Sequence, residues 1–423
     1  HALALAHGAD RLAAQRLAGD RHQRQIHGHH DVSRPALLQG AVDHPLQLDH
    51  GVFRRQPGTH AAGGRRDRLE PVVDPIAEAV VADQPLAGDA LAGVLMIDVR
   101  SGEFVFVQAQ AVLLGTGGGP TMYKYHTPSG DKTCDGMAMA LRAGLTLRDM
   151  EMVQFHPTGL LAGTGTRMTG TVLEEGLRGA GGYLLNGNKE RFMGNHDAKL
   201  ERATRDIVSR GIFAEMRAGR TTPNGGVYIS MGHLGADNNR KNFKGMVERC
   251  EDCGFDLAGG LVEVVPTAHY MMGGVAFNVD CTTSLHGLFV AGEDSGGVHG
   301  ANRLGGNGVA NSTVFGGIAG DFIPGWVKAH GAFQAPDQDA IDAAVARCKA
   351  PLSRKAGDLN AVRETLYDVM WDDVGIVRDA ASMKRAEGRL DELDARLDEI
   401  GVEAGDLAFN LTWHDWLNLK SQI

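Results

Sequence analysis

Cysteine, long apolar runs and excess positive charge are all scarce in this sequence. Five cysteines among 423 residues are too few and too scattered for a disulfide framework, which favours a reducing compartment. The one close pair, Cys250 and Cys253, has no second pair to complete a zinc site, so we expect no metal. No apolar stretch reaches the roughly 20 residues that cross a bilayer, and the net charge of -10 argues against nucleic acid as a partner.

Lysine and methionine are missing from residues 1–92, which sets this stretch apart. Nine of the eighteen histidines fall in the first sixty residues, and the chain begins with His1 rather than Met. A cluster at His27, His29 and His30 could bind a metal, but poor hydrophobic periodicity favours a disordered tail or a segment translated out of frame. We therefore base no functional assignment on residues 1–92, and we interpret the chain as a fragment or a translated partial reading frame.

Glycine, by contrast, is abundant at 58 residues, which suits a nucleotide-binding α/β protein with many tight turns. Residues 94–97, a turn at 100–102 and an alternating run from 104 to 111 predict a β-hairpin. A buried strand at 111–114 runs into glycines 115–119, and a second strand at 288–290 ends at Gly292. Such strand ends let the backbone pass close to a flat or phosphorylated ligand.

Helical patterns occupy several further segments. They are expected at 136–143, at 205–216 and from 308 to about 322, where Pro324 and Gly325 should end the helix. Near the end of the chain, Leu390, Leu393 and Leu397 belong to one apolar stripe that also includes residue 400, with a glycine at 401 as the stop. This stripe indicates packing.

Four short motifs combine glycines with isolated histidines, arginines and carboxylates. They are Phe155-His156-Pro157-Thr158-Gly159, Glu174-Glu175-Gly176-Leu177-Arg178-Gly179, His269-Tyr270-Met271-Met272-Gly273-Gly274 and His299-Gly300-Ala301-Asn302-Arg303-Leu304-Gly305-Gly306-Asn307. Each motif alone is weak, and each lone histidine could be a structural imidazole. Their order, together with the glycines at 117–118 and the strand end at 291–293, resembles the flavoproteins of succinate dehydrogenase, fumarate reductase and L-aspartate oxidase over about residues 93–423.

The resemblance implies an α/β fold with a Rossmann-like FAD-binding domain, an inserted α+β capping domain and a C-terminal helical region. The FAD-binding domain would comprise residues 93–150 and 266–325, the capping domain 151–265 and the helical region 326–423. The cofactor would be FAD, which carries the redox chemistry while the protein orients substrate and places charge.

Substrate residues follow from the same motifs. By resemblance, Arg303 clamps a carboxylate of a C4-dicarboxylate, because a guanidinium can grip it through two parallel hydrogen bonds. His156 and His269 would donate further hydrogen bonds to the substrate. Arg205 would be the proton donor, with Glu175 as the relay behind it; the alternative is that Arg205 only forms a salt bridge with its neighbour Asp206.

Flavin-side residues are also implied by the resemblance. They are Gly117, Gly118, Asp135, Glu293, Asn307, Gly308 and Val309. A helix that opens at residues 307–309 would place its positive N-terminal end beside the negative charge of the reduced ring.

The pattern departs from the family at several positions. Residues 1–92 contain no Gly-x-Gly-x-x-Gly turn to cradle the FAD pyrophosphate, and His60 lies too close to Gly117 to be the histidine that links covalently to FAD in some members. Glu174 replaces the usual hydroxyl residue and Ala180 the usual glutamate. An extra anion at position 174 would repel a dicarboxylate unless it points away.

The expected function is the interconversion of succinate and fumarate by an FAD-dependent enzyme. The alternatives are an L-aspartate oxidase, although the methionines after His269-Tyr270 favour the respiratory branch, and an inactive fragment unable to bind FAD. The resemblance implies a partner subunit with iron–sulfur clusters. It also implies a cytoplasmic position on the inner face of a membrane, held there through partners. The direction of catalysis, the electron acceptor and the oligomeric state stay open.

Overall fold

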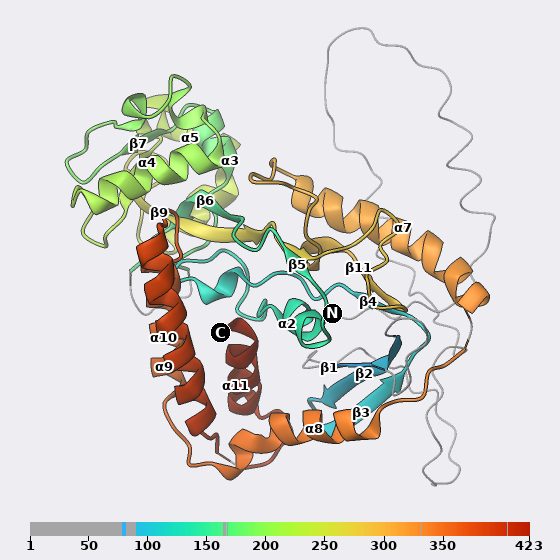
Figure 1. The fold of residues 1–423 in the computed structure, drawn as a ribbon. Helices are drawn as coiled ribbons and strands as arrows, with labels where there is room; N and C mark the ends of the chain where they lie inside the picture. The colour runs from blue at the N-terminus through green and yellow to red at the C-terminus, as the bar shows by residue number, and fades with distance from the viewer. Residues whose placement is uncertain (1–77, 82–89, 164–165, 167, 331, 404) are drawn as a thin grey trace, which may run out of the picture. The chain divides into compact units, whose positions relative to one another are not determined.

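The computed structural model describes residues 78–81, 90–163, 166, 168–330, 332–403 and 405–423. These residues form a mixed α/β fold that ends in a helical region, which agrees with the predicted fold class (Figure 1). The expectations for His27, His29, His30 and His60 lie outside the described residues.

An antiparallel sheet opens the described chain. It contains β1 (Glu78–Val81), β2 (Leu91–Asp98) and β3 (Glu103–Gln108), in the order β1-β2-β3. The turn between β2 and β3 includes Gly102, whose φ of +70° suits glycine. The predicted hairpin is therefore confirmed.

A parallel pair of short strands forms the base of the ligand-facing loops. Strand β4 (Val112–Leu114) pairs with β11 (Leu288–Val290), and all six residues are buried. The two strands point the same way, so the glycine turn after β4 and the 3-10 helix Gly292–Asp294 after β11 lie at the same edge. The two predicted strand-to-glycine units thus meet. A second small sheet pairs β5 (Leu147–Arg148) with β10 (Gly274–Val275).

A separate four-stranded antiparallel sheet carries most of the predicted substrate residues. Its strands are β6 (Val153–Leu160), β7 (Tyr183–Leu185), β8 (Val227–Ser230) and β9 (Leu261–Met271), in the order β6-β9-β8-β7. The helices in the same stretch are α3 (Glu175–Gly179), α4 (Arg205–Arg217), α5 (Ala236–Asn242) and α6 (Lys244–Glu251). Leu184, Ile212 and Val264 are fully buried in the core that this sheet shares with its helices.

Helix α7 is longer than predicted. It spans Asn307–His330 and contains Pro324, which was expected to end it. An internal proline costs about 3 kcal/mol because it removes a backbone hydrogen bond. Packing beyond the proline offsets this cost, since Trp326 meets Phe289 edge-on at 5.4 Å between ring centroids. The prediction that the helix ends near residue 322 is wrong because these tertiary contacts hold its last turns.

The remaining helices pack around two buried tryptophans. They are α2 (Asp135–Arg142), α8 (Gln338–Lys349), α9 (Leu359–Asp372), α10 (Ala380–Glu399) and α11 (Leu411–Gln422). Trp413 and Trp416 lie in one core with Leu393 and Leu397 of α10, so the predicted stripe is a packing surface.

Membrane-crossing helices and metal-binding clusters can be assessed only for the residues that the structure describes. None of the helices in this part of the chain is long and apolar enough to cross a bilayer. Within the same residues, no group of three or more His, Cys, Asp or Glu side chains could hold a metal ion. Cys250 and Cys253 are free, and burial raises the pKa of the Cys250 thiol to about 12.

Candidate active site

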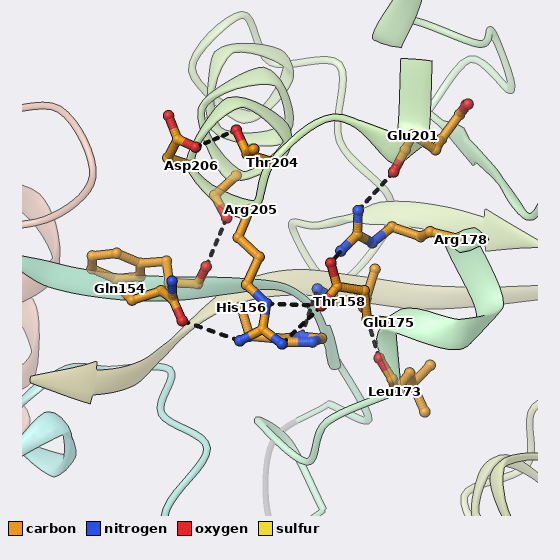
Figure 2. Close-up of polar contacts among 12 residues, drawn as sticks. Gln154, His156, Thr158, Leu173, Glu175, Arg178, Glu201, Thr204, Arg205 and Asp206 are labelled. Atoms are coloured by element: carbon orange, nitrogen blue, oxygen red, sulfur yellow. Dashed lines mark hydrogen bonds and ion pairs between the residues drawn. The ribbon is translucent and has the colours of Figure 1, made fainter. Parts of the chain in front are cut away.

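Arg205 reaches from the first turn of α4 to two different elements, as Figure 2 shows. Its Nε and Nη2 donate to Glu175 Oε2 at 3.1 and 2.9 Å, and its Nη1 donates to Gln154 Oε1 at 3.1 Å. Asp206 pairs instead with Arg210 at 3.0 Å. Arg205 is therefore held by Glu175, the residue predicted as its relay, and not by its chain neighbour.

Arg178 lies behind Glu175 and was not among the predicted site residues. Its Nη2 is 3.5 Å from Glu175 Oε1, and its Nη1 donates to the carbonyl oxygen of Glu201 at 2.6 Å. Only 1% of its side chain is exposed. Burial raises the pKa of Glu175, but its hydrogen bonds with Arg205 and the nearby arginines outweigh this and hold the pKa below its usual value. The carboxylate is thus ionised between two guanidinium groups.

The two predicted histidines lie together. Their rings, on the paired strands β6 and β9, have centroids 5.5 Å apart. Burial, followed by the charge of Arg205, lowers the pKa of His156 well below 6.5 and that of His269 to about 4. Both rings are therefore neutral at pH 7.

Each ring has a nitrogen free to bind a ligand. His156 Nδ1 accepts a hydrogen bond from the Thr158 backbone N–H at 3.3 Å, which leaves the proton of the neutral ring on Nε2. His269 Nδ1 is buried and has no hydrogen-bond partner among the described residues. Both histidines can therefore hydrogen-bond to a substrate carboxylate.

Arg303 is a buried cation without a carboxylate partner among the described residues. It is 6% exposed, its Nη1 donates only to the Leu304 carbonyl at 3.2 Å, and its Nε has no partner. Burial lowers the pKa of this guanidinium, and the charge of Arg205 lowers it further. A buried cation in this state favours an incoming anion.

Gln154 joins the two arginines and was also missed from the sequence. Its Oε1 accepts from Arg205, while its Nε2 donates to the Arg303 carbonyl at 2.6 Å and to Asn302 Oδ1 at 3.1 Å. Asn302 in turn donates to Asp206 at 3.1 Å. Gln154 stands two residues before His156 on β6, so the two side chains share one face, and this spacing was the available signal.

Glu174, the departure from the family pattern, is exposed, and its side chain makes no hydrogen bond or ion pair with a described residue. Its carboxyl carbon lies over Gly176, 3.7 Å from the point where a Cβ would stand. The side chain therefore lies exposed along the start of its own helix.

Three of the predicted flavin-side residues, Gly117, Gly118 and Glu293, follow the ends of β4 and β11, and the others begin α2 and α7. Glu293 accepts from the Met271 N–H at 2.9 Å and from Lys132 Nζ at 2.5 Å. A Cβ on Gly118 would stand 2.3 Å from Glu293 Oε1, so this glycine makes room for the carboxylate. Asp135, the first residue of α2, is buried and accepts from Thr133 Oγ1 at 2.6 Å.

Asp294 was not predicted, although it organises the glycine turn. It accepts hydrogen bonds from the Thr116 N–H, from Thr116 Oγ1 at 2.9 Å and from the Gly117 N–H at 3.1 Å. Burial raises the pKa of Asp294 to about 7, against the lowering effect of these bonds. The backbone N–H of Gly117 therefore donates to a carboxylate of the protein itself, that of Asp294.

The first turn of α7 suits the edge of a flavin ring. Asn307 N–H donates to the Leu304 carbonyl and Ala310 N–H to the Gly306 carbonyl, which leaves the N–H groups of Gly308 and Val309 without acceptors among the described residues. Val309 is 76% exposed. These free donors at a positive helix end fit the ring side of FAD.

Two family patterns match the chain. A family described as FAD binding domain matches residues 65–309, a match that begins within the segment that its composition sets apart. A second family, described as the C-terminal part of fumarate reductase flavoprotein, matches residues 363–423.

Individual relatives agree with these matches. An uncharacterized FAD-dependent oxidoreductase of Methanocaldococcus jannaschii is 40% identical over 73% of this chain and 56% of the relative. One chain of the fumarate reductase (CoM/CoB) of Methanothermobacter marburgensis is 37% identical over 80% and 61%, respectively. The structure of a mutant FrdA of Escherichia coli quinol fumarate reductase superimposes with a TM-score of 0.72 at 32% identity, covering 82% of this chain and 60% of that one.

The chain thus spans little more than half the length of the relatives that it matches. The order of the motifs, the assembled site and the matched families agree. The chain belongs to the family of FAD-dependent oxidoreductases that contains the flavoprotein subunits of succinate dehydrogenase and fumarate reductase.

Proposed function

We propose that this chain forms the substrate site of an FAD-dependent oxidoreductase that interconverts succinate and fumarate. The observation that carries the proposal is the convergence of Arg205 and Arg303 with two neutral histidines, while Arg303 has no carboxylate partner among the described residues. A relative with 37% identity is named as a fumarate reductase, which supports the same substrate.

The charges of the site suit a dianion. Arg178, Arg205 and Arg303 carry three positive charges, and Glu175 carries one negative charge between the first two. The histidines add none because both are neutral. Two uncompensated positive charges in a partly buried site would attract a C4-dicarboxylate and favour it over a monoanion.

Proton transfer is assigned to Arg205. When bound, FAD would supply or accept the hydride at one substrate carbon. Arg205 would then donate a proton to the other carbon or receive one from it, with its guanidinium held in place by Glu175 and Gln154. Glu175 lies between Arg205 and the buried Arg178, and 47% of its side chain is exposed, so its ionised carboxylate can take a proton from water and pass it to Arg205 after Arg205 has given up its own.

We also propose that electrons pass to iron–sulfur clusters of a partner subunit. In the same proposal, the protein works at the inner face of a membrane through such partners. The support is the naming of related chains as flavoprotein subunits of fumarate reductases. The described residues have no membrane-crossing helix of their own.

An Arg205→Ala substitution tests the assignment of the proton donor. In the chain incubated with FAD, we expect reduction of an artificial acceptor by succinate to fall by about 10²- to 10⁴-fold, the usual effect of losing a general acid or base. The matched control is Arg210→Ala, which removes an exposed arginine of the same helix, and it should change turnover by less than about twofold.

Comparing substrates separates the two enzymes that share this architecture. Turnover of succinate without turnover of L-aspartate supports the proposal, and the reverse result assigns the chain to the L-aspartate oxidases. Loss of turnover in Arg210→Ala equal to that in Arg205→Ala would argue against a specific proton donor.

A further inference from the structure

Before substrate binds, another group of the protein must hold the Arg303 guanidinium in place. The guanidinium is 6% exposed, its Nε has no partner, and its only side-chain hydrogen bond among the described residues is to the carbonyl of Leu304. A buried cation without an anion is free to turn toward water or toward another acceptor. Another contact within the protein must therefore fix the orientation of the guanidinium before substrate binds.

That contact is the ring face of Tyr270. The central carbon of the Arg303 guanidinium lies 4.6 Å from the ring centroid, within the range of a cation–π interaction. Tyr270 is itself buried, at 7% exposure, and directly follows His269 on β9. Strand β9 thus carries both His269, a proposed substrate ligand, and the Tyr270 ring against which Arg303, the proposed carboxylate clamp, packs.

Two side chains fix the tyrosine ring. Its hydroxyl lies 3.2 Å from His299 Nε2 and 3.2 Å from Asn311 Nδ2. Asn311 Nδ2 donates to this hydroxyl and, at 2.9 Å, to the Gly292 carbonyl, and it lies 3.3 Å from His299 Nε2. Burial, followed by the charge of Arg303, lowers the pKa of His299, so this ring is neutral at pH 7.

Gly308 closes the stack from the side of α7. A Cβ at this position would stand 2.9 Å from Tyr270 Cε2 and 3.3 Å from Arg303 Nη1. The ring and the guanidinium therefore have no room to move toward the helix. The first turn of α7 therefore limits the movement of both groups.

We propose that Tyr270 is the positioning residue of the substrate clamp. Its ring, fixed by His299 and Asn311, holds the Arg303 guanidinium in the orientation that grips a carboxylate. The proposal rests on the assignment of Arg303 as a dicarboxylate ligand. It predicts that the aromatic face is required and that the hydroxyl matters less.

Binding of malonate, measured by calorimetry on the full chain, provides the first test. Tyr270→Leu should weaken malonate binding about tenfold, whereas Tyr270→Phe keeps the ring and should restore affinity to within about threefold of the unchanged chain. The matched control is Tyr183→Leu. The Arg191 guanidinium lies 4.0 Å from the centroid of the Tyr183 ring, and neither residue is a predicted substrate residue. This substitution should leave malonate affinity unchanged.

Labelling of arginines with phenylglyoxal, followed by peptide mass spectrometry, tests the position of Arg303 without any dicarboxylate. Arg303 should react about fivefold faster in Tyr270→Leu than in Tyr270→Phe or in the unchanged chain. Gly308→Ala provides a second variant, because its methyl group must displace the ring or the guanidinium; it should accelerate labelling of Arg303 and weaken malonate binding.

The two proposals fail in different ways. If the unchanged chain does not bind malonate, the dicarboxylate function fails, while labelling still decides the role of Tyr270. If Tyr270→Leu folds and leaves the labelling of Arg303 unchanged, Tyr270 does not position the clamp. If that variant does not fold, unchanged labelling in Gly308→Ala overturns the proposal equally.

Discussion

The site histidines keep their neutral form because of where each ring lies. Burial comes first and the neighbouring arginines second in lowering the pKa values of His156 and His269. A third ring, His299, is neutral for the same two reasons. In the proposed function, the histidines would therefore bind substrate as neutral imidazoles, and arginine alone would supply the positive charge.

This assignment gives a pH prediction at the scale of residues. A folded-state pKa of about 4 means that His269 stays neutral until the pH falls toward 4, and the pKa of His156 also lies well below its usual 6.5. Malonate affinity should thus vary by less than about twofold from about pH 6.5 to about pH 8. Calorimetry across this range checks it, and affinity that rises on acidification with a midpoint near 6.5 would indicate imidazolium formation instead.

Sequence analysis identified site residues that lie in or next to short motifs. It missed residues that join the site only through long-range folding. His156, His269 and Arg303 stand in recognisable motifs, Arg205 was placed by its position at the start of a helix after the second motif, and the structure brings the four together. Gln154 was missed because its partners Arg205 and Arg303 are far away along the chain. Its role depends on the antiparallel pairing of β6 with β9 and on the loop before α7, which no local pattern specifies.

At the scale of elements, the two ends of α7 have different roles. Its N-terminal turn faces the predicted flavin site, while its C-terminal turns pack Trp326 against Phe289 and His330. Local rules predicted the start of this helix but ended it too early at Pro324, because propensity ignores the tertiary contacts that follow. The hairpin of β2 and β3, by contrast, depends on its own turn and was predicted, although β2 begins earlier, at Leu91, and β3 ends earlier, at Gln108.

Pro324→Ala should stabilise the chain. The substitution restores a helix-interior hydrogen bond and removes a cost of up to about 3 kcal/mol, while Trp326 keeps its packing partners. Urea unfolding should show a higher midpoint with an unchanged slope. Gly325→Ala, at the next and exposed position, is the control for a general gain in helix propensity and should add about 1 kcal/mol at most. A midpoint that falls in Pro324→Ala would mean that the proline shapes the helix that the core requires.

At the scale of the whole molecule, the substrate side and the flavin side come from different stretches of sequence. Strands β6 and β9 with α3 and α4 supply the histidines, Arg205 and Glu175, whereas the loop before α7 supplies Arg303. The composition of the chain predicted neither this division nor the pairing of β4 with β11. The order of the motifs, read as a family resemblance, indicated the division, but nothing in the sequence analysis paired these two strands, because long-range pairing leaves no local signature.

The central claim is that this site passes a hydride between a C4-dicarboxylate and FAD. The most direct measurement is the visible flavin absorbance of the chain after incubation with FAD and removal of excess cofactor, followed without oxygen as succinate is added. The account predicts that flavin absorbance is retained by the chain and is then bleached by succinate. Absence of bound flavin, or a bound flavin that succinate leaves unchanged, would contradict it.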